Sequence, residues 1–290
     1  MKLSGKVVLI TGASRGIGQA IALMLKDYGL HVYGTSRSAA TTPLVSGFEG
    51  GFFKMLSMDV LRKESISNAV EAILDTEGRL DVLINCAGIG IAGSLEDMTL
   101  EEYNLQMDTN VNGTLAVMRH VLPIMRRQKS GLIINIGSVA GFIGIPFQSA
   151  YSSSKAAVAL LTEALRLEVA PFGIKACVVE PGDTKTGFTA ARVFCKAALN
   201  PAYRDTFERS VYAMERAEEN GKSPDSVANV VLRLIKRKNP PARVCVGASY
   251  KAVRLLKRLL PGALVEAILT QMYLKAKPAP EGWARQRGLE

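Results

Sequence analysis

The sequence has few cysteines and no long apolar run, and both shortages exclude classes of protein. Its four cysteines, Cys86, Cys177, Cys195 and Cys245, lie far apart and form no C-x-x-C pair. A disulfide framework or a zinc site is therefore not expected, and a reducing, cytoplasmic compartment fits better. No run of about 18 apolar residues occurs, so we expect no membrane-spanning helix, and the apolar stretch before Gly12 is too short for a signal peptide.

The first 230 residues lack a net charge, although the whole chain of 290 residues carries a formal charge of +10. Residues 1–190 contain 17 basic and 17 acidic side chains, and residues 191–230 contain six of each. Residues 231–290 contain 13 basic and three acidic side chains, so they carry the whole excess. A basic chain often binds nucleic acid, but this distribution predicts a neutral body with a basic C-terminal segment and no nucleic-acid partner.

Short apolar runs alternate with longer helical patterns over the first 180 residues. The predicted strands are 7–10, 31–35, 52–56, 82–84, 132–136 and 174–179, and the predicted helices are 16–28, 64–76, 100–127 and 152–169. This β-α-β alternation predicts an α/β fold with a parallel sheet covered by helices on both faces.

The pattern changes after Pro181. Residues 183–223 have mixed helical stretches and few strand signals. Ser223 is a predicted N-cap, with Pro224 in the first position of the next helix. Residues 277–290, rich in Pro, Gly and Arg, are predicted to be loosely ordered. The elements predicted between these segments are a strand at 243–246 and helices at 250–260 and 263–274.

A glycine-rich stretch, TGASRGIG at residues 11–18, lies between the first predicted strand and the first predicted helix. Glycines here allow a tight turn and a close approach to a pyrophosphate, which the helix N-terminus favours. The spacing is G-x-x-x-G-x-G rather than G-x-G-x-x-G, so the stretch alone is equally consistent with an ordinary turn. Its position in a βαβ unit favours a nucleotide site, with the candidate contacts Gly12, Ser14, Arg15, Gly16, Ile17 and Gly18.

No acid stands near the end of the second predicted strand, where a nucleotide site usually holds the ribose hydroxyls. The segment at 35–38 reads TSRS, and Arg37 together with Arg15 would clasp a 2′-phosphate through charge-assisted hydrogen bonds. This arrangement favours NADP(H) over NAD(H), and the alternative is a pair of solvated surface arginines. Asp59 and Val60, after the third strand, are candidate contacts for adenine, or else Asp59 caps the following helix.

Tyr151 and Lys155 are four residues apart at the start of a long predicted helix, so they share one face. A free tyrosine has a pKa of about 10, and a nearby ammonium lowers that pKa. The pair is therefore a candidate proton donor for a carbonyl, and Ser138 is positioned to hydrogen-bond the same oxygen. A Y-x-x-x-K pair by itself is common, and the alternative is a pair of surface residues.

These motifs occur in one order together with the segments NCAG at 85–88, NVNG at 110–113 and PG at 181–182. In combination they make the chain resemble the short-chain dehydrogenase/reductase family over about residues 3–250. The resemblance implies a single Rossmann-type doubly wound parallel sheet with a substrate loop at about 183–223 and a helical C-terminal extension at 251–290. It also implies an NADP(H)-dependent oxidoreductase that interconverts a ketone or aldehyde and an alcohol.

The resemblance assigns roles by position. Tyr151 would be the general acid in reduction, and Lys155 would lower its pKa and hold the nicotinamide ribose hydroxyls. Ser138 would orient the substrate oxygen, and Asn110 would support a water-mediated proton relay to Lys155. The further cofactor contacts that the family implies are Asn85, Ala87, Gly88, Pro181, Gly182 and either Thr184 or Thr186.

An apolar pocket is expected from residues 90–95, 139–148 and 183–215. The candidate lining residues are Phe142, Ile143, Ile145, Phe147, Phe188, Val193 and Phe194, several of which would otherwise be core. The apolar stretch at 141–147, PFGI at 171–174 and the basic extension are most similar to the hydroxysteroid and retinol dehydrogenase branch, which implies a hydrophobic, steroid- or retinoid-like substrate. The alternatives are a 3-oxoacyl or small carbonyl substrate, or an NADPH-binding regulatory protein without catalysis.

Two expectations concern partners. The helices at 100–127 and 152–169 usually pair in this family, so we expect a homodimer or homotetramer. A basic amphipathic helix at 250–260 carries Lys251, Arg254, Lys257 and Arg258 among leucines. Such a helix can lie on an anionic membrane surface; the alternatives are a helix packed on the body with a solvated basic face, or a flap over the substrate cleft.

Overall fold

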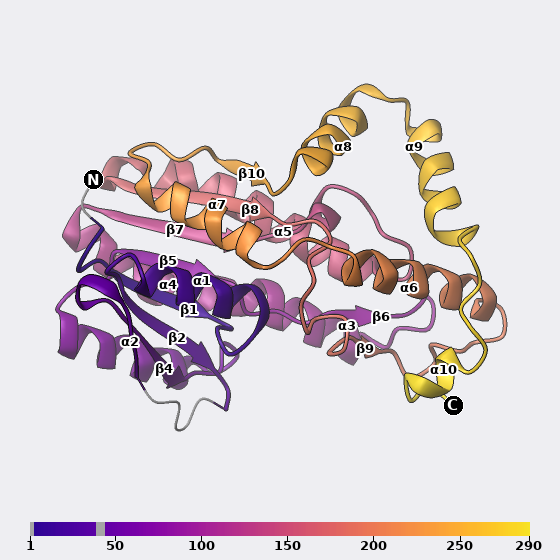
Figure 1. The fold of residues 1–290 in the computed structure, drawn as a ribbon, viewed down its shortest axis with the longest axis horizontal. Helices are drawn as coiled ribbons and strands as arrows, with labels where there is room; N and C mark the ends of the chain where they lie inside the picture. The colour runs from indigo at the N-terminus through magenta and orange to yellow at the C-terminus, as the bar shows by residue number, and fades with distance from the viewer. Residues whose placement is uncertain (1–2, 39–43) are drawn as a thin grey trace.

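A mostly parallel β-sheet lies between two layers of helices (Figure 1). The computed structural model describes residues 3–38 and 44–290, and within this part of the chain the main sheet has eight strands. Their order is β10-β8-β7-β5-β1-β2-β4-β3, and every neighbouring pair is parallel except β3 with β4. The strands are β1 (Val7–Thr11), β2 (His31–Ser36), β3 (Val45–Ser46), β4 (Phe52–Ser57), β5 (Val82–Asn85), β7 (Gly131–Ile136), β8 (Ile174–Glu180) and β10 (Arg243–Cys245). The predicted α/β fold is confirmed.

The helices bury apolar faces against both sides of the sheet. The helices are α1 (Gly16–Lys26), α2 (Lys63–Glu77), α3 (Leu100–Met107), α4 (Gly113–Gln128), α5 (Ser149–Glu168), α6 (Arg204–Glu219), α7 (Asp225–Lys236), α8 (Ala248–Leu259), α9 (Gly262–Leu269) and α10 (Trp283–Gln286). α1 and α7 cover one face, and α2, α4 and α5 cover the other. β1 and β5 are buried along their whole length, which is why they are unbroken apolar runs in the sequence. No helix in the described part of the chain is long and apolar enough to cross a membrane.

The loops after β1 and β5 diverge at the carboxyl edge of the sheet, because the chain crosses from β1 to β2 while β5 lies on the other side of β1. Gly12, directly after β1, has a φ of 68°, and a Cβ there would lie 2.8 Å from the Cα of Ala87. Thr11 Oγ1 accepts hydrogen bonds from the N–H groups of Cys86 and Ala87, both at 3.0 Å. The two loops are thus joined where doubly wound sheets bind ligands.

Two short pairings and two changes of helix type differ from the sequence prediction, and one of these changes is the π-turn at Thr270–Leu274 that follows α9. The pattern does not predict β3, nor the two-stranded sheet of β6 (Ile91–Ala92) and β9 (Val193–Phe194), because two residues carry no period. The helix predicted at 100–127 is α3, a π-turn at Asp108–Asn112 and α4 in succession. A π-turn inserts a residue into a helix without ending it, and this one carries Asn110.

The helix predicted to begin at Pro224 begins one residue later, at Asp225, with Pro224 as its N-cap. Ser223 still acts at this end, since its Oγ accepts a hydrogen bond from the N–H of Asp225 at 3.2 Å. The Ser-Pro-Asp signal therefore locates the start of α7 to within one residue.

After β10 the chain is helical, and it leaves the body before it returns (Figure 1). α8 and α9 form an arch, and the chain then runs beside α6 to α10, near β9. The predicted loose order of residues 277–290 is wrong: Trp283 is buried and donates from Nε1 to Glu215 Oε2 at 2.9 Å. Its indole packs against Phe194 and Phe207, so the tail closes an apolar cluster.

Candidate active site

A cavity of about 520 Å³ opens at the carboxyl edge of the sheet, where the loops after β1 and β5 diverge. It is lined by the glycine-rich loop, the ends of β2 and β4, the loops after β5, β7 and β8, and residues of β9, α6 and the segment after α9. The predicted site residues on its wall are Gly12, Ser14, Arg15, Gly16, Ile17, Gly18, Arg37, Asp59, Val60, Ala87, Gly88, Ser138, Ile145, Tyr151, Lys155, Pro181, Gly182, Thr184, Thr186 and Phe188. Segments far apart in the sequence therefore meet around one space.

The glycine-rich loop fits a pyrophosphate. A Cβ at Gly18 would lie 2.3 Å from the carbonyl oxygen of Gly12, so only glycine lets α1 begin this close to β1. Gly16, the first residue of α1, has a φ of 59°. The free N–H groups and the dipole of α1 favour an anion at this end of the cavity.

The end of β2 presents a cation where a NAD site usually has an acid. Its lining residues are Thr35, Ser36 and Arg37, and Arg15 of the glycine-rich loop lines the same cavity. Guanidinium groups here fit a 2′-phosphate. Asp59 faces the cavity too, while its Oδ1 accepts a hydrogen bond from the N–H of a neighbouring leucine at 3.0 Å. Asp59 therefore lines the cavity and also caps a local backbone N–H, so the two roles predicted for it are compatible.

Tyr151 lies in the first turn of α5, with its ring centre 5.7 Å from that of Phe188. Desolvation raises the pKa of Tyr151 to about 12, and a hydrogen bond with Ser138 opposes this rise. Ser138 follows β7, and its Oγ also accepts the N–H of Ala140 at 3.1 Å. Tyr151 therefore keeps its proton at neutral pH, next to a serine whose position the backbone fixes.

Lys155 is buried one turn further along α5. Its Nζ donates to the carbonyl oxygen of Ile136 at 2.9 Å and lies 5.7 Å from the centre of the Tyr151 ring. Desolvation lowers the pKa of Lys155 to about 8. Desolvation is the largest effect on the pKa of Tyr151, and the Lys155 ammonium bonds to the carbonyl oxygen at the end of β7, so a lowering of the Tyr151 pKa by Lys155 stays a prediction.

Asn110 and Asn85 stand behind the cavity wall. Asn110 Oδ1 accepts a hydrogen bond from the N–H of Ile89 at 2.9 Å, which fixes the loop after β5. A Cβ at Gly88 would lie 3.0 Å from this oxygen and 3.8 Å from the Nζ of Lys155. Asn110 and Lys155 therefore both approach the backbone of Gly88 closely. Asn85 donates to an asparagine of β7 at 2.8 Å and supports the sheet instead.

Thr184 and Thr186 both line the cavity, so the choice between them stays open. The Thr184 hydroxyl donates to the carbonyl oxygen of Gly182 at 2.8 Å. Thr186 Oγ1 accepts the N–H of Phe188 at 3.2 Å, and its Cβ would lie 3.5 Å from a Cβ at Gly16. Thr186 is therefore the one beside the glycine-rich loop.

The predicted apolar lining is met in part. Ile145, Phe188 and Val193 line the cavity, whereas Phe142, Ile143, Phe147 and Phe194 do not. Phe147 has a φ of 59°, and its ring turns away to pack on Phe207 with ring centres 5.5 Å apart. Phe194 packs on Phe207 as well, and the Phe142 ring faces the guanidinium of Arg254 at 5.9 Å. These three rings fill space between elements instead of facing the cavity.

Two residues on the wall, Asp183 and Met214, fall within the predicted pocket segment 183–215, although neither was named individually. Glu218 of α6 and Tyr273 of the segment after α9 lie outside every predicted pocket segment. No local signal marks these two, because the fold brings them to the cavity from distant parts of the chain.

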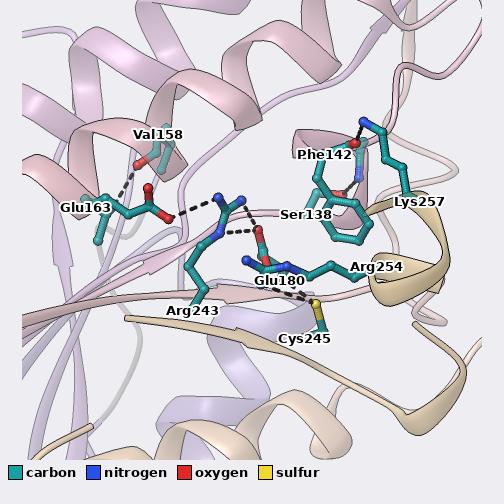
Figure 2. A network of polar contacts seen from close by, with 11 residues as sticks. Ser138, Phe142, Val158, Glu163, Glu180, Arg243, Cys245, Arg254 and Lys257 are labelled. Atoms are coloured by element: carbon teal, nitrogen blue, oxygen red, sulfur yellow. Dashed lines mark hydrogen bonds and ion pairs between the residues drawn. The ribbon is translucent and has the colours of Figure 1, made fainter. Parts of the chain in front are cut away.

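The loop after β8 is tied to α8 through an ion network (Figure 2). Glu180, the last residue of β8, is buried and accepts from Arg243 at 2.5 Å and from Arg254 of α8 at 2.9 Å. Tyr250 of α8 donates to Asp183 Oδ2 at 2.5 Å, and its ring occupies the space that a side chain at Gly182 would need. α8 therefore helps to position the wall of the cavity on both sides of Pro181.

Comparison with known proteins gives a consistent result. Residues 6–193 match the family described as short chain dehydrogenase. The chain is 46% identical over 270 residues to a 3-ketodihydrosphingosine reductase of Bacteroides thetaiotaomicron, which covers 92% of this chain and 98% of that protein. It is 39% identical over 191 residues to a 3-oxoacyl-[acyl-carrier-protein] reductase of Vibrio cholerae, covering 66% and 78%. A solved short-chain dehydrogenase from Streptomyces avermitilis shares 33% identity at a TM-score of 0.75, covering 93% and 97%.

Proposed function

The chain belongs to the short-chain dehydrogenase family of oxidoreductases, and we propose that it uses NADP(H) to reduce the ketone of a long-chain 3-oxo lipid. The observation that carries the proposal is one cavity that has Arg15 and Arg37 on its wall, contains Tyr151 and Ser138, and has apolar side chains beside them. The reverse oxidation of the alcohol uses the same groups.

The residues around the reacting carbonyl supply position and a proton. NADPH supplies a hydride when bound. Ser138 donates a hydrogen bond to the carbonyl oxygen, and Tyr151 gives its proton to the same oxygen as negative charge develops there. Lys155 holds the ribose hydroxyls, and its charge stabilises the phenolate that Tyr151 becomes. Asn110 positions the loop beside Lys155 and supports the return of a proton through water.

The length of the similarity supports the lipid substrate. The match to the 3-ketodihydrosphingosine reductase takes in 92% of this chain, whereas the match to the 3-oxoacyl reductase takes in 66%. Ile145, Phe188 and Val193 supply apolar wall for an alkyl chain. A steroid- or retinoid-like substrate and a 3-oxoacyl thioester are the alternatives.

A substrate panel with NADPH tests the choice. It contains a long-chain 3-oxo lipid, a ketosteroid, retinal, a 3-oxoacyl thioester and a small polar ketone. We expect the highest kcat/KM on the long-chain 3-oxo lipid. A higher value on the steroid or retinal would move the function to that branch, and activity on the small ketone alone would overturn the proposal.

Tyr151→Phe distinguishes an enzyme from a regulatory NADPH-binding protein. We expect turnover to fall about 10²- to 10⁴-fold, because the ring keeps its packing but has no proton to give. NADPH binding, measured by calorimetry, should change little. Unchanged turnover would contradict the mechanism.

We also propose that the chain is a homodimer or homotetramer. Leu160 and Leu167 of α5 are 64% and 77% exposed and seven residues apart, so they lie on one helical face. Leu115 of α4 is exposed as well. A second copy would cover this face, and Leu160→Glu should shift the mass measured by light scattering toward the monomer.

The α8–α9 arch is a proposed contact with an anionic membrane, on the cytoplasmic side. Tyr250 and Arg254 bond to the body, which leaves Leu255, Leu256 and Leu259 exposed on α8. Exposed leucines beside the basic groups of this segment suit an interface between apolar chains and anionic headgroups. A membrane contact here would place the arch where a lipid substrate is dissolved.

Vesicle flotation tests the arch. Wild-type protein should float with vesicles that contain phosphatidylglycerol and less with phosphatidylcholine alone. Leu255→Gln/Leu259→Gln should lose flotation, while Leu100→Gln, at an even more exposed leucine at the start of α3, should keep it. Equal flotation of both variants would remove the arch from the proposal.

A further inference from the structure

A carboxylate with no place in the hydride and proton transfer described above lines the cavity. Glu218, near the end of α6, contributes to the wall, and its side chain is 17% exposed. The same cavity is lined by Ala191, Met214 and Tyr273, and Met214 lies one helical turn before Glu218 on α6. Removing a carboxylate from water in such an apolar setting costs free energy unless hydrogen bonds or cations compensate it, either from the protein or from a ligand in the cavity.

Both carboxylate oxygens of Glu218 have a partner from the protein. Arg192 Nη2 donates to Glu218 Oε1 at 2.5 Å, and Thr189 Oγ1 donates to Oε2 at 2.5 Å. The Arg192 side chain is completely buried and does not line the cavity. Arg192 therefore stands behind the carboxylate and fixes it, while the remaining acceptor positions of the two oxygens stay available.

Glu218 lies close to the reacting groups. Phe188 packs its ring against that of Tyr151, and the next residue, Thr189, holds the Glu218 carboxylate. The pKa of Tyr151 is raised first by desolvation and lowered by the hydrogen bond with Ser138, and among the smaller effects Glu218 raises it and Arg192 lowers it. The Glu218 carboxylate therefore acts on the tyrosine hydroxyl.

A second tyrosine that lines the cavity also responds to carboxylates. Desolvation raises the pKa of Tyr273 to about 12, and Asp183 and Glu218 raise it further. Arg15 and Arg37 come from the glycine-rich loop and the end of β2, in the part of the wall assigned above to the 2′-phosphate. The carboxylates of Asp183 and Glu218 therefore line the cavity on segments other than those that carry Arg15 and Arg37.

We propose that Glu218 binds an ammonium group on the carbon next to the reacting ketone, so that the preferred substrates are long-chain 2-amino-3-ketones. This inference rests on the proposed function and narrows it. An ammonium has three donors and pairs strongly with a fixed carboxylate. Holding the amine orients the adjacent carbonyl toward Tyr151 and Ser138. A 3-ketodihydrosphingosine is a 2-amino-1-hydroxy-3-ketone, so it carries an amine on the carbon next to its ketone. A 3-oxoacyl thioester has no such amine.

The experiment compares two substrates in two variants of the full chain. The substrates are a ten-carbon 2-amino-1-hydroxy-3-ketone and its 2-deamino counterpart, short enough to stay soluble, each reduced with NADPH. The variants are Glu218→Gln and, as a matched control, Glu219→Gln, which removes the exposed neighbouring carboxylate. Glu218→Asp keeps the charge and shortens its reach.

Wild-type enzyme should prefer the amino ketone by about tenfold or more in kcat/KM. Glu218→Gln should abolish this preference, mainly through KM on the amino ketone, and leave the deamino ketone within about twofold. Glu219→Gln should match wild type, and Glu218→Asp should lie between. The preference should also fall as the pH rises through the pKa of the substrate amine.

Each failure has a separate signature. Equal use of both ketones by wild type, or an intact preference in Glu218→Gln, overturns the ammonium site and leaves ketone reduction standing. Reduction of neither ketone by wild type overturns the proposed function and the inference together. Loss of both substrates in Glu218→Gln would mean that the residue supports the structure, and this too would overturn the site.

Discussion

Lys155 is a buried ammonium whose main protein partner is one backbone carbonyl, at 2.9 Å. Its pKa of about 8 lies below the ordinary 10.5, so the folded chain binds this proton less tightly than the unfolded chain does. The charge therefore lowers the free energy of unfolding below about pH 8, and the penalty disappears as the pH rises toward 10.5. Lys155, which the proposed reaction needs, therefore lowers the free energy of unfolding at neutral pH.

Lys155→Met should therefore stabilise the chain while it abolishes turnover. We expect a gain of about 1–3 kcal/mol in the free energy of unfolding at pH 7, because an apolar side chain replaces a desolvated charge. The gain should shrink by pH 10. Urea denaturation at both pH values measures it, and a variant less stable than wild type at pH 7 would contradict the argument.

Arg37 is the residue on which the cofactor preference depends. Arg37→Ala should raise the KM for NADPH about ten- to a hundredfold by removing charge-assisted hydrogen bonds to the 2′-phosphate. The KM for NADH, which lacks that phosphate, should stay within about twofold. Steady-state kinetics with both cofactors provide the measurement, and Arg127→Ala on α4, which does not line the cavity, is the control. Equal loss with both cofactors would assign Arg37 another role.

Single residues could be predicted from the sequence where a motif fixes them to a strand end or a helix start. Tyr151, Lys155 and Ser138 fall in this group, and the structure brings them to one cavity. Glu218 could not be predicted, since nothing near it distinguishes it from the other acids of α6. Phe147 was predicted to line the pocket but packs on Phe207 instead, because the sequence does not distinguish an apolar side chain of the core from one that lines a pocket.

At the scale of elements, the end of β8 depends on cations that come from later in the chain (Figure 2). Glu180 is fully buried, and Arg243 contributes two hydrogen bonds to one of its oxygens, at 3.1 and 2.5 Å. Arg254 contributes one bond to the other oxygen from a side chain that is 37% exposed. The two arginines should therefore differ in their effect on stability.

Arg243→Met should cost about 3–5 kcal/mol, because it leaves a buried carboxylate without its main partner. Arg254→Met should cost about 1–2 kcal/mol, because water can reach that side of the pair. Adding Glu180→Gln should restore part of the loss in the Arg243 variant and less in the Arg254 variant. Chemical denaturation gives the order, and a reversed order would show that Arg254 is the principal partner.

The long elements could be predicted because burial on both faces leaves a clear apolar run. β1 and β5 are examples. Two-residue strands such as β6 and β9 could not be predicted, because tertiary packing alone pairs Ile91 with Val193. The π-turn at Asp108–Asn112 was also missed, since one extra residue hardly disturbs a helical pattern.

At the scale of the whole molecule, the basic C-terminal segment is part of the fold. Arg287 bonds to the buried Glu215 at 2.8 Å, and Arg243 and Arg254 bond to Glu180. Some of the +10 charge therefore neutralises acids inside the body. Composition suggested a loose tail because Pro, Gly and Arg are common in linkers, but it could not show that the chain holds an apolar cluster ready to receive Trp283.

Trp283→Ala should destabilise the chain by about 3–5 kcal/mol, since it empties a space between Phe194 and Phe207. Trp283→Phe keeps most of the packing and loses the hydrogen bond to Glu215, so about 1–2 kcal/mol is expected. Thermal unfolding followed by circular dichroism measures both. An unchanged melting temperature in the alanine variant would show that the tail contributes nothing to the fold.

Trp283 is also the only tryptophan in the sequence. Its indole is enclosed by the apolar cluster between α6 and β9, so the tryptophan emission of the native protein, excited selectively over the tyrosines, arises from this one place. Emission should lie at short wavelength while the tail is docked and shift to the red when the tail leaves. The unmodified chain thus carries its own optical reporter, which separates release of the C-terminus from unfolding of the sheet.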